Sequence, residues 1–506
     1  MDSFKHAFGV DQLSASAQAN LNGNIVAMLQ AGCFFGALFS GPMSTQWGRK
    51  WPLVTSGVIY LIGSVIQTIS GIGSSASVGL SVLYFGRFVG GFGLGLMSAI
   101  VPSYVAECTP KAIRGRCTGF IQFSNNIGMM LSFWVNYSAS ANLPYGNMQW
   151  RMPFAVQLIT GFLFAILMLP QPESPRWLVE HERYDQAAQT LAYVARKPAD
   201  DPIVIATLNE IKADFATSKR IPLLAQFRMM GSSRSMLIRA YIPSFVLCWQ
   251  QWTGTNAINY FSPQIFQGLG ISGTTSSLFA TGVYGVIKVI AVGLTTLLGI
   301  EGMGRKLCLI IGGLGQGLTM FWIGGYSAIH PQDTIVPASY VSIVAVYLYA
   351  VFYCIGWGPV PWVVASEVVD NKVRTAALSI AVAINWLFVF VVSRATPVML
   401  DQITYGTFIL FGACCIVMSI WTYVCLPETT GYALEDIKYL FEKDVILRSV
   451  QDSPGGRMFL GAKRASPMAE IKAESEQGEL PGADEDGKKG DSSSRIEQIG
   501  ADVDVL

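Results

Sequence analysis

The chain alternates between long apolar blocks and short polar connections. Each block contains about twenty or more predominantly apolar residues, which is the length that a helix needs to cross a bilayer. The blocks are apolar on all sides, whereas helices that cover a soluble core keep a polar face. The pattern therefore predicts an all-α membrane protein with eleven spans. These spans are residues 24–44, 51–71, 79–106, 117–137, 150–169, 240–261, 276–300, 307–328, 339–365, 376–396 and 406–426.

Lysine and arginine are confined to alternate connections, and the intervening connections contain neither residue. Because Lys and Arg are retained on the cytoplasmic side of a membrane, the basic connections face the cytoplasm. We therefore expect the N-terminus outside and the C-terminus inside. The basic residues lie at 49–50, 111–116, 176–239, 305–306 and 372–374.

Short motifs recur along the chain at an offset of about 255 to 260 residues. The triplet GRK at 48–50 returns at 304–306, and Pro-Glu at 172–173 returns at 427–428. Such self-similarity predicts two homologous halves. The first half has five apolar blocks and the second has six, so symmetry places a further span before residue 24. We therefore expect the chain to be incomplete at its N-terminus.

Five segments follow from these patterns. The long basic segment between the halves carries helical periodicity over 177–215, which predicts cytoplasmic helices. The end of the chain is rich in Gly, Ser and charged residues, which predicts disorder after about residue 445. The segments are a polar N-terminal stretch (1–23), an N-terminal bundle (24–169), a cytoplasmic linker (170–239), a C-terminal bundle (240–426) and a cytoplasmic tail (427–506).

Composition excludes several classes of function. Of 506 residues, 51% are hydrophobic and 13% are charged, and the formal net charge of +1 offers no basic field for nucleic acid. The cysteines show no metal-ligand spacing. The glycine-rich segment 90–95 lies inside an apolar block with no preceding strand, so close helix packing explains it better than a dinucleotide site. We expect no enzyme activity, no metal and no cofactor.

Amide and tryptophan side chains lie at mid-span, where an uncharged polyol would need them. An amide both donates and accepts hydrogen bonds without burying a charge, which suits the hydroxyls of a polyol. Amides also join membrane helices to one another, and this alternative remains open for Asn125 and Asn126. The predicted substrate-binding residues are Gln122, Gln250, Gln251, Asn256, Asn259, Trp362 and Asn385, with Trp386 beside the last of them.

Charged residues at the predicted cytoplasmic ends of the spans form the second group. Glu107 precedes Arg114 by seven residues, and Glu367 precedes Arg374 by the same spacing. Ion pairs between the halves would close the inner side and break when it opens, whereas the alternative is solvated anchoring charge. The segment GPVP (358–361) would break its helix beside Trp362. The candidate gating residues are Arg87, Glu107, Arg114, Glu173, Arg176, Arg305, Glu367, Arg374 and Glu428, with Arg49 in the same group.

Two further basic residues within the spans bear on the substrate. Lys288 falls at mid-span and Arg394 falls near an outer end, where its side chain can reach the interface. A buried cation without a partner is costly and marks function by default. Lys288 is therefore a candidate anion contact, neutralised either by a substrate carboxylate or by an aspartate on the absent span. It favours an anionic polyol over a neutral hexose.

An ordered set of motifs covers most of residues 24–445 and resembles the sugar porter family of the major facilitator superfamily, and within it the fungal quinate and sugar permeases. Two departures are the inner-loop segments TQWGRK (45–50) and EGMGRK (301–306), which lack charged residues of the family signature. The motifs are GRFVGGFGLG (86–95), PSYVAE (102–107), PESPRWL (172–178), QQWTGTNAINYFSP (250–263), EGMGRK (301–306), GWGPVPW (356–362) and PETTG (427–431).

The resemblance implies the major facilitator fold, with two helical bundles and transport by alternating access. It implies sugar contacts at the matching positions, and proton symport through a carboxylate that would lie in the absent span. We expect a small polyol as substrate, such as quinate, a sugar acid or a monosaccharide, in a fungal plasma membrane with no obligate protein partner. A sugar receptor that binds without transport, or an inactive truncated transporter, are the alternatives. The sugar contacts implied are Gln122, Gln250, Gln251, Asn256, Trp362 and Asn385.

Overall fold

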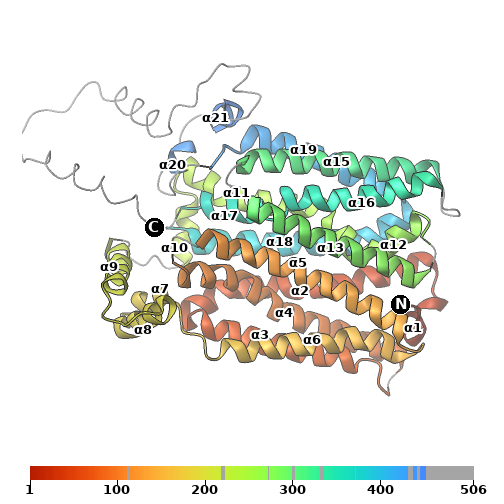
Figure 1. The fold of residues 1–506 in the computed structure, drawn as a ribbon, viewed down its shortest axis with the longest axis horizontal. Coiled ribbons are helices and arrows are strands. Elements are labelled where there is room, and N and C mark those ends of the chain that lie inside the picture. Colours follow the sequence, from red (N-terminus) through yellow and green to blue (C-terminus); the bar gives the residue numbers. More distant parts are fainter. Residues whose placement is uncertain are drawn as a thin grey trace, which may run out of the picture. The chain divides into compact units, whose positions relative to one another are not determined.

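The computed structural model is helical throughout its described residues, with no strand among them. Residues Met1–Ala462 form one compact unit, which is the unit described below. Figure 1 shows long helices running alongside one another, with α7, α8 and α9 beyond one end of them. The described residues are 1–73, 75–110, 114–217, 223–271, 273–298, 303–330, 336–370, 372–430, 437–441 and 445–451.

The first half begins with two short N-terminal helices and continues with five long ones. The first long helix begins at Ala15, nine residues before the expected span, because Ser14 caps it by accepting from the Ala17 backbone N–H at 3.4 Å. The helices are α1 (Asp2–Ala7), η1 (Val10–Gln12), α2 (Ala15–Trp47), α3 (Lys50–Ile69), α4 (Ala76–Cys108), α5 (Arg114–Asn142) and α6 (Asn147–Met168).

Short helices form the linker between the halves. Ser174 caps α7 by accepting from the Trp177 backbone N–H, and Pro175 occupies the first helical turn, where its missing N–H is harmless. Buried apolar residues such as Trp177, Ala187 and Leu208 hold three of these helices together. The linker helices are α7 (Pro175–Glu180), α8 (Tyr184–Ala195), α9 (Pro202–Thr217) and α10 (Leu223–Met230).

The second half contains two broken helices. A residue in the left-handed conformation, Gly254 at φ 84°, separates α11 from α12, and Gly356 to Pro359 separate α16 from α17. Two short helices follow the last long one. The helices are α11 (Arg234–Trp252), α12 (Thr255–Gly268), α13 (Thr274–Leu298), α15 (Arg305–Ile329), α16 (Pro337–Ile355), α17 (Val360–Val368), α18 (Arg374–Gln402), α19 (Tyr405–Cys425), α20 (Ile437–Leu440) and α21 (Val445–Gln451).

Nine helical segments of the described residues are long and apolar enough to cross a membrane, against eleven expected spans. The two expected spans outside this set are α5, which carries Gln122, Asn125 and Asn126, and the pair α11 and α12, which is divided at Gly254. Both therefore depart from an uninterrupted apolar helix at the places where the sequence carries polar side chains. The helix α21 lies beyond residue 445, where disorder is expected to begin, and its Ser449 is buried.

Glycine faces allow the helices of the first half to approach closely. A Cβ atom added to Gly32 of α2 would lie 2.1 Å from the Phe88 carbonyl oxygen, and one added to Gly95 of α4 would lie 2.1 Å from the Cys33 carbonyl oxygen. The prediction that the glycine-rich segment 90–95 serves close helix packing is therefore confirmed. Between the halves, α2 packs on α18 and α5 packs on α13.

Candidate functional site

A chain of amide side chains runs through the second half at the junction of α11 and α12. The Gln251 Nε2 group donates to Gln250 Oε1 at 3.3 Å, and the Asn256 Nδ2 group donates to Gln251 Oε1 at 2.6 Å. Asn385 of α18 joins them, since its Nδ2 group donates to Gln250 Oε1 at 3.3 Å. Four of the predicted binding residues therefore form one hydrogen-bonded cluster, which we call the amide chain: Gln250, Gln251, Asn256 and Asn385.

The amide chain is anchored at the break between α16 and α17. The Gln250 Nε2 group donates to the Trp357 carbonyl at 2.6 Å and to the Gly358 carbonyl at 3.0 Å. In a continuous helix the Trp357 carbonyl would accept from residue 361, but Pro361 has no backbone N–H. Gln250 thus satisfies a backbone group that the proline leaves open, and it couples the amide chain to a broken helix of the kind that lines binding sites in membrane proteins.

Lys288 of α13 lies beside Asn259, which follows Asn256 of the amide chain by one turn of α12, and is 1% exposed. Its Nζ atom lies 3.3 Å from Asn259 Oδ1 and 3.6 Å from the sulfur of Met129, which belongs to α5 of the other half. The ring centroid of Tyr353 lies 5.0 Å from the same Nζ atom. Among the described residues, no carboxylate lies within ion-pair distance of this ammonium group.

Asn259 is held by two donors at once. Its Oδ1 atom accepts from the Tyr284 hydroxyl at 3.1 Å as well as from Lys288. Neither Tyr284 nor Tyr353 is among the residues predicted from the sequence, because one tyrosine within an apolar block carries no signal that separates it from core packing. Their position around Lys288 becomes evident only when α12, α13 and α16 are assembled.

The remaining predicted binding residues lie along the boundary between the halves. Trp362 and Trp386 pack against a small apolar cluster that contains Ala37 of α2. The Trp386 indole N–H donates to Ser98 Oγ of α4 at 3.0 Å, so this tryptophan joins the two halves. In α5, the Asn126 Nδ2 group donates to the Gln122 carbonyl of its own helix at 2.8 Å, while Asn125 is exposed.

The inner end of the first half carries a network of one arginine and two glutamates. The Arg49 guanidinium pairs with Glu107 at 2.9 Å, and both side chains are more than four-fifths buried. The Glu173 carboxylate accepts from the backbone N–H groups of Arg49 at 2.8 Å and of Lys50 at 3.1 Å. It therefore caps the N-terminus of α3, where a negative charge is favoured by the helix dipole. The Ser174 hydroxyl donates to Glu107 Oε2.

The inner end of the second half repeats this network. Arg305 pairs with Glu367 at 3.1 Å, and the Glu428 carboxylate accepts from the backbone N–H groups of Arg305 at 3.0 Å and of Lys306 at 3.1 Å. The Thr429 hydroxyl donates to Glu367 Oε2 at 2.8 Å, as Ser174 does in the first half. The same three-part arrangement thus closes each half at its inner end.

Comparison with known proteins identifies the family. The profile of the family described as "Sugar (and other) transporter" matches residues 1–441. The chain belongs to this family. This transporter is a multi-pass membrane protein of the major facilitator fold, and the predicted fold class is confirmed.

Curated relatives and solved structures agree with the family. The probable quinate permease of Neosartorya fischeri is 34% identical over 457 residues, which cover 89% of this chain and 84% of the relative. The quinate permease of Emericella nidulans is 34% identical over 452 residues, with 88% and 84% covered. The proton:xylose symporter XylE bound to 6-bromo-6-deoxy-D-glucose has a TM-score of 0.73 and 28% identity, and 87% of this chain and 94% of that one are covered.

Two of the predicted gating residues, Glu107 and Glu367, form ion pairs within their own halves, Arg49–Glu107 and Arg305–Glu367. Ion pairs between the halves stay a prediction. The side chain of Arg114 lies outside the described residues, and the Arg374 guanidinium donates to the Ser366 carbonyl at 3.4 Å.

Arg87 does not lie at the cytoplasmic end, which corrects its expected place. It lies in the half of α4 nearer Ala76, whereas Glu107 stands at the other end of the same helix. At 1.5 Å per residue the two are separated by about 30 Å along the axis. The Arg87 guanidinium lies 5.5 Å from the ring centroid of Phe154, near the beginning of α6. Arg87 is therefore a membrane-embedded cation rather than part of the inner networks.

Further inner-end and outer-end contacts were not predicted. Arg239, at the beginning of the apolar part of α11, pairs with Asp370 at 3.1 Å and donates to the Val368 carbonyl at 2.9 Å. It thereby fixes the end of α17. At the opposite end of the molecule, the Arg394 guanidinium donates to Asn20 Oδ1 of α2 at 2.9 Å, which joins the two halves. Of the predicted gating residues, Arg176 has no recorded ion pair with Glu173 among the described residues.

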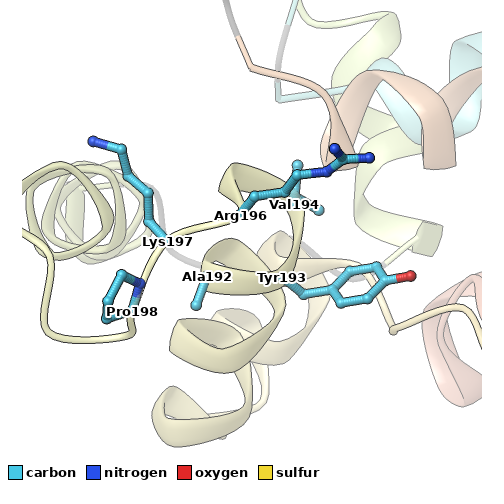
Figure 2. A pocket seen from close by; sticks show the side chains of 6 residues that line it. All are labelled: Ala192, Tyr193, Val194, Arg196, Lys197 and Pro198. Atoms are coloured by element: carbon cyan, nitrogen blue, oxygen red, sulfur yellow. The ribbon is translucent and has the colours of Figure 1, made fainter.

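A surface hollow lies in the linker, away from the amide chain. Figure 2 shows it at the end of α8, with Arg196, Lys197 and Tyr193 among its lining residues, and its volume is about 810 Å³. The lining comes from one short stretch of the linker, and Lys197 already pairs with Asp201 at 3.4 Å. This surface hollow has no connection to the residues that face the membrane interior.

Proposed function

We propose that this chain carries a small polyol across a membrane by alternating access and that the amide chain binds the hydroxyls of the substrate. The observation that carries the proposal is the hydrogen-bonded convergence of Gln250, Gln251, Asn256 and Asn385 beside a broken helix. Each amide presents a donor and an acceptor, so the cluster can exchange its internal hydrogen bonds for bonds to a polyol at little cost. Trp362 supplies an apolar face on the adjoining half-helix.

The proposed substrate carries a carboxylate. Lys288 is buried without an acidic partner among the described residues, and its nearest oxygen belongs to the neutral amide of Asn259. A buried ammonium group without a counter-ion is unfavourable, so an anion that enters beside it gains both a Coulomb attraction and a charge-assisted hydrogen bond. Quinate or a sugar acid fits these requirements better than a neutral hexose. The names of the fungal relatives support the same choice.

The gating proposal follows from the two inner networks. Each network fixes three helices of one half, so that the half can move as a rigid body, and the short helix α17 follows a break that can act as a hinge. The contacts between the halves are separate from these networks and include Trp386–Ser98 and Arg394–Asn20. We further propose proton symport, as in the proton:xylose symporter XylE, and location in the plasma membrane.

Radiolabelled uptake in cells that lack their own sugar transporters tests the proposal. Quinate, galacturonate, glucose and myo-inositol are compared at two external pH values. Acid-stimulated uptake of quinate or galacturonate is expected, and Lys288→Met should lower it by about tenfold or more, which corresponds to ~1.4 kcal/mol. Glucose uptake that does not depend on pH would overturn both the anion and the symport proposals. Binding without uptake would indicate a receptor.

The amide chain is tested in the same assay by Asn385→Ala, with Asn142→Ala as the matched control. Asn142 is an exposed asparagine at the outer end of α5, where its amide bonds only within its own helix. Removing Asn385 deletes one hydrogen bond of the cluster and should lower uptake about tenfold, since a buried polar group is left without its partner. Equal uptake by the two variants would show that the amides only join helices.

A further inference from the structure

The buried side chain of Lys306 makes contacts beyond those of the inner network. Lys306 is 1% exposed, although it is only the second residue of α15. Its Nζ atom donates to the Tyr423 carbonyl at 2.8 Å, to Ser449 Oγ at 2.7 Å and to the Ser449 carbonyl. These neutral oxygens replace part of the water shell of the ammonium group and tie it to two separate segments of the chain.

These contacts join the end of the chain to the end of α19. Ser449 of α21 is fully buried, and its hydroxyl donates to the Tyr423 and Leu426 carbonyls at 2.9 Å. Carbonyls in the last turn of a helix have no partner within that helix. Lys306 and Ser449 supply these partners, and the positive charge of Lys306 is favoured at a helix C-terminus. The helix α21 is thereby fixed against both α15 and α19.

The segment just before α21 reaches a third helix. Ile437, Leu440 and Phe441 are buried in the same apolar cluster as Val364 and Val368 of α17. We call residues 437–441 and 445–451 together the C-terminal brace. Through its described residues the brace contacts α15, α17 and α19 on the side of the molecule that carries Glu367 and Arg305.

The corresponding lysine of the first half, Lys50, has no equivalent contact among the described residues. Lys50 follows Arg49 as Lys306 follows Arg305, and the backbone N–H groups of both lysines are capped by a glutamate. The Lys50 ammonium, however, lies 5.5 Å from the ring centroid of Trp51, a residue that is 57% exposed. The burial of Lys306 therefore comes from the brace and not from the repeated motif.

We propose that Lys306 and Ser449 are positioning residues for the inner gate: they hold the C-terminal brace on the second half, and the brace restrains α17. The helix α17 carries Trp362 and Glu367 and follows the break at 356–359, where the backbone can act as a hinge. Its inner end is also held by the Arg305–Glu367 pair and by Arg239. The brace adds a further restraint, and its release gives the inner end of α17 more freedom.

Hydrogen–deuterium exchange on the full chain in lipid nanodiscs tests this proposal without any substrate. Lys306→Met, Ser449→Ala and the double variant are compared with Lys50→Met, which removes the corresponding charge in the first half. Release of the brace should speed amide exchange at least about fivefold in 437–441, 445–451 and 360–368. Exchange in α4 and α13 should stay unchanged, whereas a general loss of stability would raise it there too.

Three results would overturn the proposal. If amide exchange rises in the brace while residues 360–368 stay protected, the brace does not restrain α17. A double variant with unchanged exchange in 445–451 would mean that Lys306 and Ser449 do not hold the brace. Equal changes in Lys50→Met would assign the effect to the repeated motif. Because the measurement requires no transport, its failure is distinct from failure of the proposed function.

Discussion

The inner ends of the two halves use the same chemistry with different sequences around it. In each half a glycine in the left-handed region, Gly48 at φ 85° and Gly304 at φ 90°, precedes an arginine that pairs with a glutamate. A second glutamate caps the helix that follows. The central polar side chains differ, because the amide chain and Lys288 belong to the second half. The repeat thus preserves the element that holds a half together, while the side chains proposed to bind substrate are concentrated in one half.

The largest effect should follow from removing the paired carboxylates. Glu107→Gln and Glu367→Gln each leave an arginine that is more than four-fifths buried without its counter-ion. Breaking a buried ion pair from one side costs ~3 kcal/mol. We expect both variants to unfold at lower temperature in detergent and to lose most uptake. Asp401→Asn, at an exposed site on α18, is the control. If only one of the two Glu→Gln variants lowered the unfolding temperature and the uptake, the two networks would not be equivalent.

A smaller effect is expected at the two glycines. An alanine at position 48 would place Cβ 2.3 Å from Glu173 Oε2, and one at position 304 would place it 2.7 Å from Glu428 Oε2. Both positions also require a positive φ, so each Gly→Ala change should destabilise by roughly 2 kcal/mol, more at Gly48. Gly325→Ala of α15 is the control, since nothing lies within 4 Å of its added Cβ. If Gly304→Ala lowered the unfolding temperature more than Gly48→Ala does, the closer contact in the first half would not determine the size of the effect.

These motifs can be predicted from the sequence because each consists of a few polar or charged side chains that lie close together along the chain. The repeated GRK and Pro-Glu segments predict two homologous halves, and the polar residues from Gln250 to Asn259 predict a group of amides at mid-span; the caps and the hydrogen bonds among the amides emerge only from the structure. Arg87 was misplaced because it was grouped with other charges by type, although its distance from Glu107 along one helix separates them. The partners of the inner arginines depend on the direction of a turn, which the spacing of Glu and Arg does not contain.

Contacts with backbone groups are the part that could not be predicted. Lys306 binds the carbonyls of Tyr423 and Ser449, and every residue has a carbonyl, so no residue type marks the acceptor. The same holds for Gln250, whose acceptor at Trp357 becomes available because Pro361 has no backbone N–H to donate to it. The number of spans is also hard to predict, since polar residues lower the apolar signal of α5 and Gly254 separates α11 from α12.

The smallest effect should appear where the halves meet. Trp386→Phe keeps the ring in the apolar cluster with Ala37 but removes the hydrogen bond from its indole N–H to Ser98 Oγ. A neutral hydrogen bond contributes about 1 kcal/mol, and this one joins α18 to α4 across the boundary between the halves. If it is present in only one state of the transport cycle, its loss shifts the balance of states and changes the uptake rate about fivefold, with thermal stability nearly unchanged. Trp322→Phe, on an exposed face of α15, is the control. Uptake equal to that of the control would show that Trp386 does not distinguish the states, and the contact would then count as packing shared by all of them.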